Sequence, residues 1–154
     1  MTASTRNTRI IKAPPQALYD AFLDPAALAE WLPPGDMTGK IHAFDARVGG
    51  GYRMSLYYPP DEQTHSGKTA DKEDQVEVRF VELTPPRRIV ETVTFVTDDP
   101  AFKGEMTMTA AFEPTAGGTE VTLDFTNLPS GIKPEDNEEG GRLSLEKLAR
   151  RFER

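Results

Sequence analysis

The fold is decided near the C-terminus, where residues 105–152 read EMTMTAAFEPTAGGTEVTLDFTNLPSGIKPEDNEEGGRLSLEKLARRF. Over 106–112 and again over 121–126, apolar and polar residues alternate, which predicts two strands that each bury one face. The spacing then becomes helical, with apolar residues at Leu145, Leu148, Ala149 and Phe152. A hairpin followed by an amphipathic helix indicates a sheet that is covered on one face by that helix.

The upstream sequence adds strands to this sheet. Five more are predicted, over residues 5–12, 39–44, 52–58, 76–80 and 89–96. Pro15 and the Asp24-Pro25 pair are typical helix starts and predict two short helices after the first strand, the second over 26–31. Residues 59–74 are polar and contain glycine and proline, so we expect a long hairpin loop. The order predicts one α+β domain over 1–154, with a curved antiparallel sheet of about seven strands around a long C-terminal helix.

The composition excludes several classes of function. The chain has 154 residues, of which 18 are basic and 25 acidic, and its net charge of −7 argues against nucleic acid or an anionic membrane as the main partner. It has no cysteine, which excludes thiol catalysis, iron–sulfur clusters and cysteine zinc sites. No apolar run is long enough to span a bilayer and no secretory signal pattern is present, so a cytoplasmic protein is expected.

Five segments carry a resemblance to a known family. They read RIIKAPPQALYDAF (9–22), DPAALAEWLPP (24–34), FDARVGGGYRMSL (44–56), ELTPPRRIVETVTF (82–95) and EEGGRLSLEKLARRFE (138–153). In this order they resemble START and Bet v 1-like domains (the SRPBCC superfamily), and more narrowly the single-domain relatives of the C-terminal domain of the Hsp90 ATPase activator. The resemblance implies a helix-grip fold. Because one helix does not fill a strongly curved sheet, we expect a cavity between the two.

Two positions depart from the pattern of that family. The family often has paired tryptophans after the second helix, where this chain has Trp31 followed by Leu32. It usually has Gly-Trp in the last helix, where this chain has a second glycine, Gly141. If Gly141 takes the place of the tryptophan, it lies one turn before Leu145 on the buried stripe. The missing indole would then leave a space for another residue or for a ligand.

Glu91 is the candidate residue for acid/base chemistry or for anchoring a ligand. If strict alternation holds, Glu91 shares a face with Ile89 and Val93 and points inward, where burial would raise its pKa. In the other phase of the strand, Val90 and Thr92 point inward and Glu91 is solvated. Both phases are open on the sequence.

No other pattern marks a catalytic or cofactor site. His42 and His65 lack the spacing and the further ligands of a metal site, and neither a metal nor a cofactor is expected. The nucleophile elbow, the phosphate-binding loop, the dinucleotide fingerprint and H-E-x-x-H are absent from the sequence. Arg53 and Arg79 are expected either at the surface or at the cavity mouth, where an arginine would bind a ligand carboxylate.

Three functions are open. The first is binding of a small hydrophobic ligand, a lipid or an aromatic, polyketide-like metabolite, between the C-terminal helix and the sheet. The candidate ligand-binding residues are Trp31, Met54, Leu56, Phe80, Glu91, Met106, Met108, Gly141, Leu145 and Leu148. The second is an enzyme that is similar to polyketide cyclases or aromatases, or a hydrolase, with Glu91 as the catalytic candidate. The third and least favoured is a module that binds an Hsp90-type chaperone. The edges of an open sheet also allow a homodimer.

Overall fold

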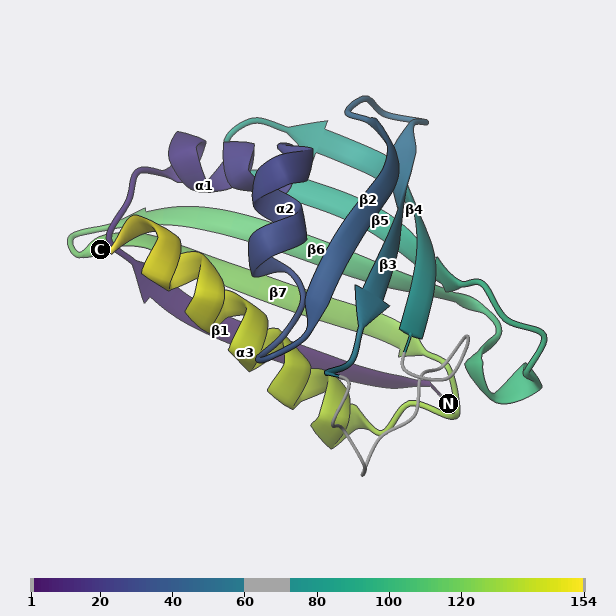
Figure 1. The fold of residues 1–154 in the computed structure, drawn as a ribbon. Helices are drawn as coiled ribbons and strands as arrows, with labels where there is room; N and C mark the ends of the chain where they lie inside the picture. The colour runs from purple at the N-terminus through teal and green to yellow at the C-terminus, as the bar shows by residue number, and fades with distance from the viewer. Residues whose placement is uncertain (1, 60–72, 154) are drawn as a thin grey trace.

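Seven strands form one antiparallel sheet in the order β1-β7-β6-β5-β4-β3-β2, and three α-helices lie on one side of it (Figure 1). This computed structural model describes residues 2–59 and 73–153. The strands are β1 (Ala3–Ile11), β2 (Thr38–Asp45), β3 (Gly51–Tyr57), β4 (Glu73–Thr84), β5 (Arg88–Phe95), β6 (Glu105–Thr115) and β7 (Gly118–Leu128). The helices are α1 (Pro15–Phe22), α2 (Pro25–Trp31) and α3 (Pro134–Phe152), and η1 (Pro100–Phe102) is a short 3-10 turn. This is the predicted α+β helix-grip fold.

Prolines and a capping aspartate set where the helices begin. Pro15, Pro25 and Pro134 are the first residues of α1, α2 and α3, where a backbone N–H is not needed. The carboxylate of Asp24 accepts a hydrogen bond from the backbone N–H of Ala26 at 3.0 Å, which satisfies an otherwise unpaired donor of α2. The predicted starts of the two short helices are therefore confirmed within one residue.

The turn between β2 and β3 needs glycine. Gly49 has a φ of +87°, a conformation that residues with a side chain rarely adopt. A Cβ built on Gly51 would lie 1.8 Å from the carbonyl oxygen of Val78, so β4 passes too close for any side chain. The N–H of Gly49 also donates to the carbonyl of Phe80 at 2.9 Å. The turn thus fixes the start of β3 and the position of Tyr52, its first buried residue.

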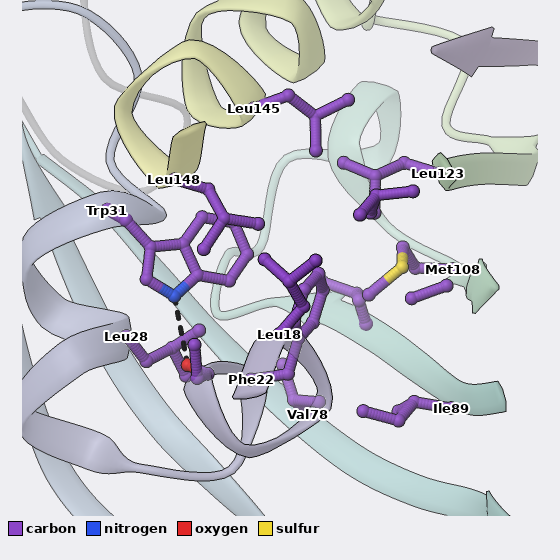
Figure 2. Close-up of a cluster of buried hydrophobic side chains, with 14 of the residues drawn as sticks. Leu18, Phe22, Leu28, Trp31, Val78, Ile89, Met108, Leu123, Leu145 and Leu148 are labelled. Carbon is purple, nitrogen blue, oxygen red and sulfur yellow. Dashed lines mark hydrogen bonds between the residues drawn. The ribbon is translucent and has the colours of Figure 1, made fainter. Parts of the chain in front are cut away.

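The core lies between the sheet and the three helices. In Figure 1, α3 runs along β1 and α2 lies beside β2. Figure 2 shows side chains of all three helices meeting those of the sheet. Leu18 and Phe22 come from α1, Leu28 and Trp31 from α2, Leu145 and Leu148 from α3, and Val78, Ile89, Met108 and Leu123 from the sheet. Burying each such side chain stabilises the fold by about 1.5–3 kcal/mol relative to leaving it exposed.

The strand β4 differs most from its predicted bounds. It begins at Glu73, whose backbone pairs with Tyr57 on β3, although the residues before 76 are polar. Pairing with the neighbouring strand therefore outweighs local composition, and the end of the loop predicted over 59–74 is strand. The rest of that loop, with His65, lies outside the described residues. Within 2–59 and 73–153, no helix is long and apolar enough to cross a membrane.

Candidate functional site

The inner face of the sheet, on the side of the helices, forms the wall of the candidate site. On β5 the buried residues are Ile89, Glu91, Val93 and Phe95, so Glu91 points inward and the solvated phase is wrong. Nine of the ten candidate ligand-binding residues are buried, and Leu56 is half-buried. The candidates from the strands and from α3 therefore face one interior, as their alternation and helical spacing require.

Glu91 is a carboxyl group among apolar neighbours. Its backbone pairs with Phe80 on β4 and with Met108 on β6, and the residue is 6% exposed. The hydroxyl of Tyr52 donates a hydrogen bond to Oε1 of Glu91 at 3.4 Å. No salt bridge joins Glu91 to a basic side chain among the described residues. Burial raises the pKa of Glu91 to about 8, which the hydrogen bond only partly offsets, so the group is mostly protonated at neutral pH.

Tyr52 belongs to a cluster of three aromatic rings beside Glu91. Its ring stacks on Phe44 at a centroid distance of 5.4 Å and lies 5.9 Å from Phe80. Phe44 and Phe80 meet edge to face at 6.0 Å. Burial, and then the nearby Glu91, raise the pKa of Tyr52 well above its ordinary value. At neutral pH, Glu91 and Tyr52 are therefore two uncharged hydroxyl groups that lie side by side.

A hollow of about 530 Å³ lies between α2 and β2, next to this pair. Phe44 lines the hollow and stacks on Tyr52. Gly39 also lines it, and a Cβ built there would lie 2.7 Å from the methyl carbon of Met54. Phe44 thus links the hollow to Tyr52, and Met54 lies against Gly39. A second hollow, of about 420 Å³, is lined by residues of β4 and β5 and by the segment after β5.

The side chain of Asn7 occupies the space beside Gly141, the position expected to correspond to the family's tryptophan. A Cβ built on Gly141 would lie 2.3 Å from Nδ2 of Asn7, so the amide packs directly against α3. This nitrogen is buried and has no hydrogen-bond partner among the described residues. Two residues earlier on β1, Thr5 donates to the side chain of Asn137, one turn before Gly141. From the sequence, we expect either another residue or a ligand in this space, and the structure has another residue, Asn7, there.

Trp31 is part of the packed interior. It is 1% exposed, and its ring centroid lies 4.6 Å from that of Phe22. Its indole N–H donates to the carbonyl oxygen of Ala21 at 2.9 Å, the dashed contact in Figure 2. On the α3 side, the hydroxyl of Ser144 donates to the carbonyl of Leu32 at 2.6 Å. These contacts join α2 to α1 and to α3 above the inner face.

A polar cluster centred on Ser55 was missed by the sequence reasoning. Ser55 is next to the inward-facing Met54 and so points to the opposite face, yet it is 1% exposed. Its hydroxyl donates to Glu73 at 2.7 Å and lies 2.8 Å from Nε2 of His42. In a catalytic triad the histidine stands between serine and acid, whereas here the serine is in the middle. No three acidic or histidine side chains of the described residues are placed to hold a metal ion.

The fold and the site together define a class: a small α+β helix-grip domain with a carboxylic acid buried on the inner face of its sheet. The chain belongs to the family of activator of Hsp90 ATPase homolog 1-like proteins, whose model matches residues 12–153. No curated protein matches the chain.

Several solved structures are similar over nearly the whole chain. A protein from Chromobacterium violaceum is 35% identical, with a TM-score of 0.85, and the match covers 98% of this chain and 97% of that one. A protein from Staphylococcus epidermidis is 20% identical, with a TM-score of 0.76 and coverages of 99% and 91%. DynU16, described as a protein in the dynemicin biosynthetic locus, is 19% identical, with a TM-score of 0.68 and coverages of 97% and 47%. The last two likenesses concern the fold alone.

Proposed function

We propose that this protein binds a small apolar molecule between α3 and the inner face of the sheet. One observation carries the proposal: Glu91 and Tyr52 place two polar groups among apolar side chains of the inner face, beside Phe80 and Met108. A buried polar group without strong partners costs free energy, and a ligand group that pairs with it would recover that cost. The helix-grip fold of the family supports the proposal.

The side chains of the inner face can rearrange to make room for a ligand. The described side chains pack against one another between α3 and the sheet, so a ligand must displace some of them. Met54, Met106 and Met108 lie on the inner face, and methionine is the most adaptable of the apolar side chains. The hollow between α2 and β2 offers the entry, because Phe44 lines it and stacks on Tyr52, the partner of Glu91.

Methionine methyl groups give a test at the wall itself. Protein labelled with ¹³C at the methionine methyls is titrated with ethylbenzene and followed by NMR. Saturable shifts are expected at Met54 and Met108, with little change at Met37 in the loop between α2 and β2. Native mass spectrometry of freshly purified protein, with organic extraction, would then identify any ligand that is retained. Shifts confined to Met37, or none at any concentration, would contradict the proposal.

A second candidate function is catalysis of the cyclase kind at the same place. It is favoured by the pKa of Glu91, which burial raises to about 8, because a general acid or base works best when its pKa is near the operating pH. Glu91 would move the proton and Tyr52 would hold the reacting oxygen. Glu91→Gln should then abolish turnover of a bound polyketone while its binding persists, and retained turnover would exclude this role.

A further inference from the structure

We propose that Glu91 and Tyr52 together donate hydrogen bonds to one oxygen atom of the ligand, so that the ligand is an uncharged apolar molecule with a ketone or similar carbonyl group. This inference rests on the proposed function and names the ligand class for the same site. Its basis is the geometry of the two hydroxyl groups and the charges that surround them.

The two groups are close but weakly joined. The Tyr52 hydroxyl and Oε1 of Glu91 are 3.4 Å apart, longer than the usual range of about 2.5–3.0 Å for a hydrogen bond between oxygens. Neither group is therefore fully satisfied by the other. A carbonyl oxygen has two lone pairs and can accept from both donors at once. A third oxygen placed between them would complete the hydrogen bonding that the protein leaves weak.

The surroundings select against a charged ligand. Three residues of other strands lie next to Glu91: Tyr52 on β3, Phe80 on β4 and Met108 on β6. Of these three, Tyr52 is the one whose side chain can titrate. The other inward carboxyl group of the described sheet, Asp74, lies six residues before Phe80 on β4 and accepts from Tyr58. No basic side chain of the described residues pairs with Glu91 to balance a ligand carboxylate.

The protonation of Glu91 supports the same ligand class. Burial raises the pKa of Glu91 to about 8, so at neutral pH the group carries a proton that it can donate. An amine would instead require Glu91 to ionise among apolar neighbours, which costs free energy. A tyrosine beside a protonated carboxylic acid in an apolar site is a known arrangement for holding a carbonyl or enolate oxygen.

Three probes of nearly equal shape separate these possibilities. Acetophenone carries the carbonyl, ethylbenzene lacks the oxygen, and benzoate replaces the methyl ketone by a charged carboxylate. Affinities are measured at pH 6.5 from the methyl shifts of Met54 and Met108. Acetophenone is expected to bind about tenfold more tightly than ethylbenzene, the effect of one or two net hydrogen bonds, and benzoate should bind most weakly.

Two variants and a control test whether Glu91 and Tyr52 cause the preference for acetophenone over ethylbenzene. Tyr52→Phe removes one donor and should reduce the preference for acetophenone several-fold while the affinity for ethylbenzene is kept. Tyr19→Phe removes another buried hydroxyl, which has no partner among the described residues, and should leave the preference unchanged. As the pH passes about 8, the preference should fall in the wild type and persist in Glu91→Gln, whose amide also donates.

The outcomes distinguish this inference from the proposed function. If ethylbenzene binds at the wall as tightly as acetophenone, or if Tyr52→Phe keeps the full preference, the ketone assignment is overturned and apolar binding stands. If benzoate binds as well as acetophenone, the assignment is also overturned. If none of the three probes shifts Met54 or Met108, both proposals fail.

Discussion

The buried Glu91 makes the stability of this protein depend on pH in a direction that can be calculated. The folded chain holds the Glu91 proton up to about pH 8, whereas the unfolded chain releases it near the ordinary value of 4.5. Between these two values, unfolding releases a proton. The free energy of unfolding should therefore fall as the pH rises through this window, and the loss should level off above pH 8.

The size of the effect follows from the same two values. Each pH unit inside the window costs about 1.4 kcal/mol. From pH 5 to pH 7, Glu91 should therefore remove about 2–3 kcal/mol from the free energy of unfolding, a substantial part of the about 5–15 kcal/mol that a domain has. Glutamine has a similar shape and no proton to release. The stability of Glu91→Gln relative to the wild type should thus rise by about 2–3 kcal/mol over the same range.

Urea unfolding at pH 5, 6, 7 and 8 measures this difference. Trp31 is the single tryptophan and is fully buried, so its fluorescence reports the loss of the core. Glu77→Gln is the matched control, because Glu77 is exposed on the neighbouring strand β4. The free energy of unfolding of Glu77→Gln should change with pH in parallel with that of the wild type. If the profile of Glu91→Gln is also parallel, then Glu91 is not a buried neutral acid and the reasoning is wrong.

Three further changes test the packing around the site by urea unfolding, followed by circular dichroism. Gly141→Ala should cost about 1 kcal/mol because the new Cβ meets the amide of Asn7, but it should stabilise by up to about 1 kcal/mol in an Asn7→Ala background, since alanine favours a helix. Additive effects would contradict this. Asp24→Ala should cost about 1 kcal/mol through loss of the α2 cap, and Asp24→Asn should cost much less. Trp31→Phe should cost about 2–4 kcal/mol through lost packing and an unpaired carbonyl of Ala21, and a cost near zero would refute its role in the core.

The sequence was sufficient for most of the fold because local patterns determine it. Period-two alternation places Met106, Met108 and Leu123 on one face, and helical spacing puts Leu145 and Leu148 on the face that meets them. These rules depend on neighbours along the chain. They fail at the start of β4, where pairing with β3 extends the strand into residues whose composition is that of a loop.

The site was predicted only in part because its contacts join distant strands. Alternation placed Glu91 on the inner face in one of two phases, and the burial of every second residue along β5 decides between them. The contact of Tyr52 with Glu91 depends on β4 standing between β3 and β5, which no local pattern encodes. Phe44 was missed for the same reason, since its partner Tyr52 lies on the next strand. Asn7 beside Gly141 follows from the path of α3 along β1.

A last prediction separates what Glu91 does for the fold from what it does for the ligand. An apolar side chain of similar length removes the cost of burying the acid, so Glu91→Met should stabilise the protein at pH 7 by up to about 3 kcal/mol. The same variant should lose the preference for acetophenone over ethylbenzene, because methionine donates no hydrogen bond. Greater stability with this loss would mean that the fold tolerates Glu91 for the sake of its site. A destabilised Glu91→Met would mean instead that the acid is part of the packing, and that its contact with Tyr52 is structural.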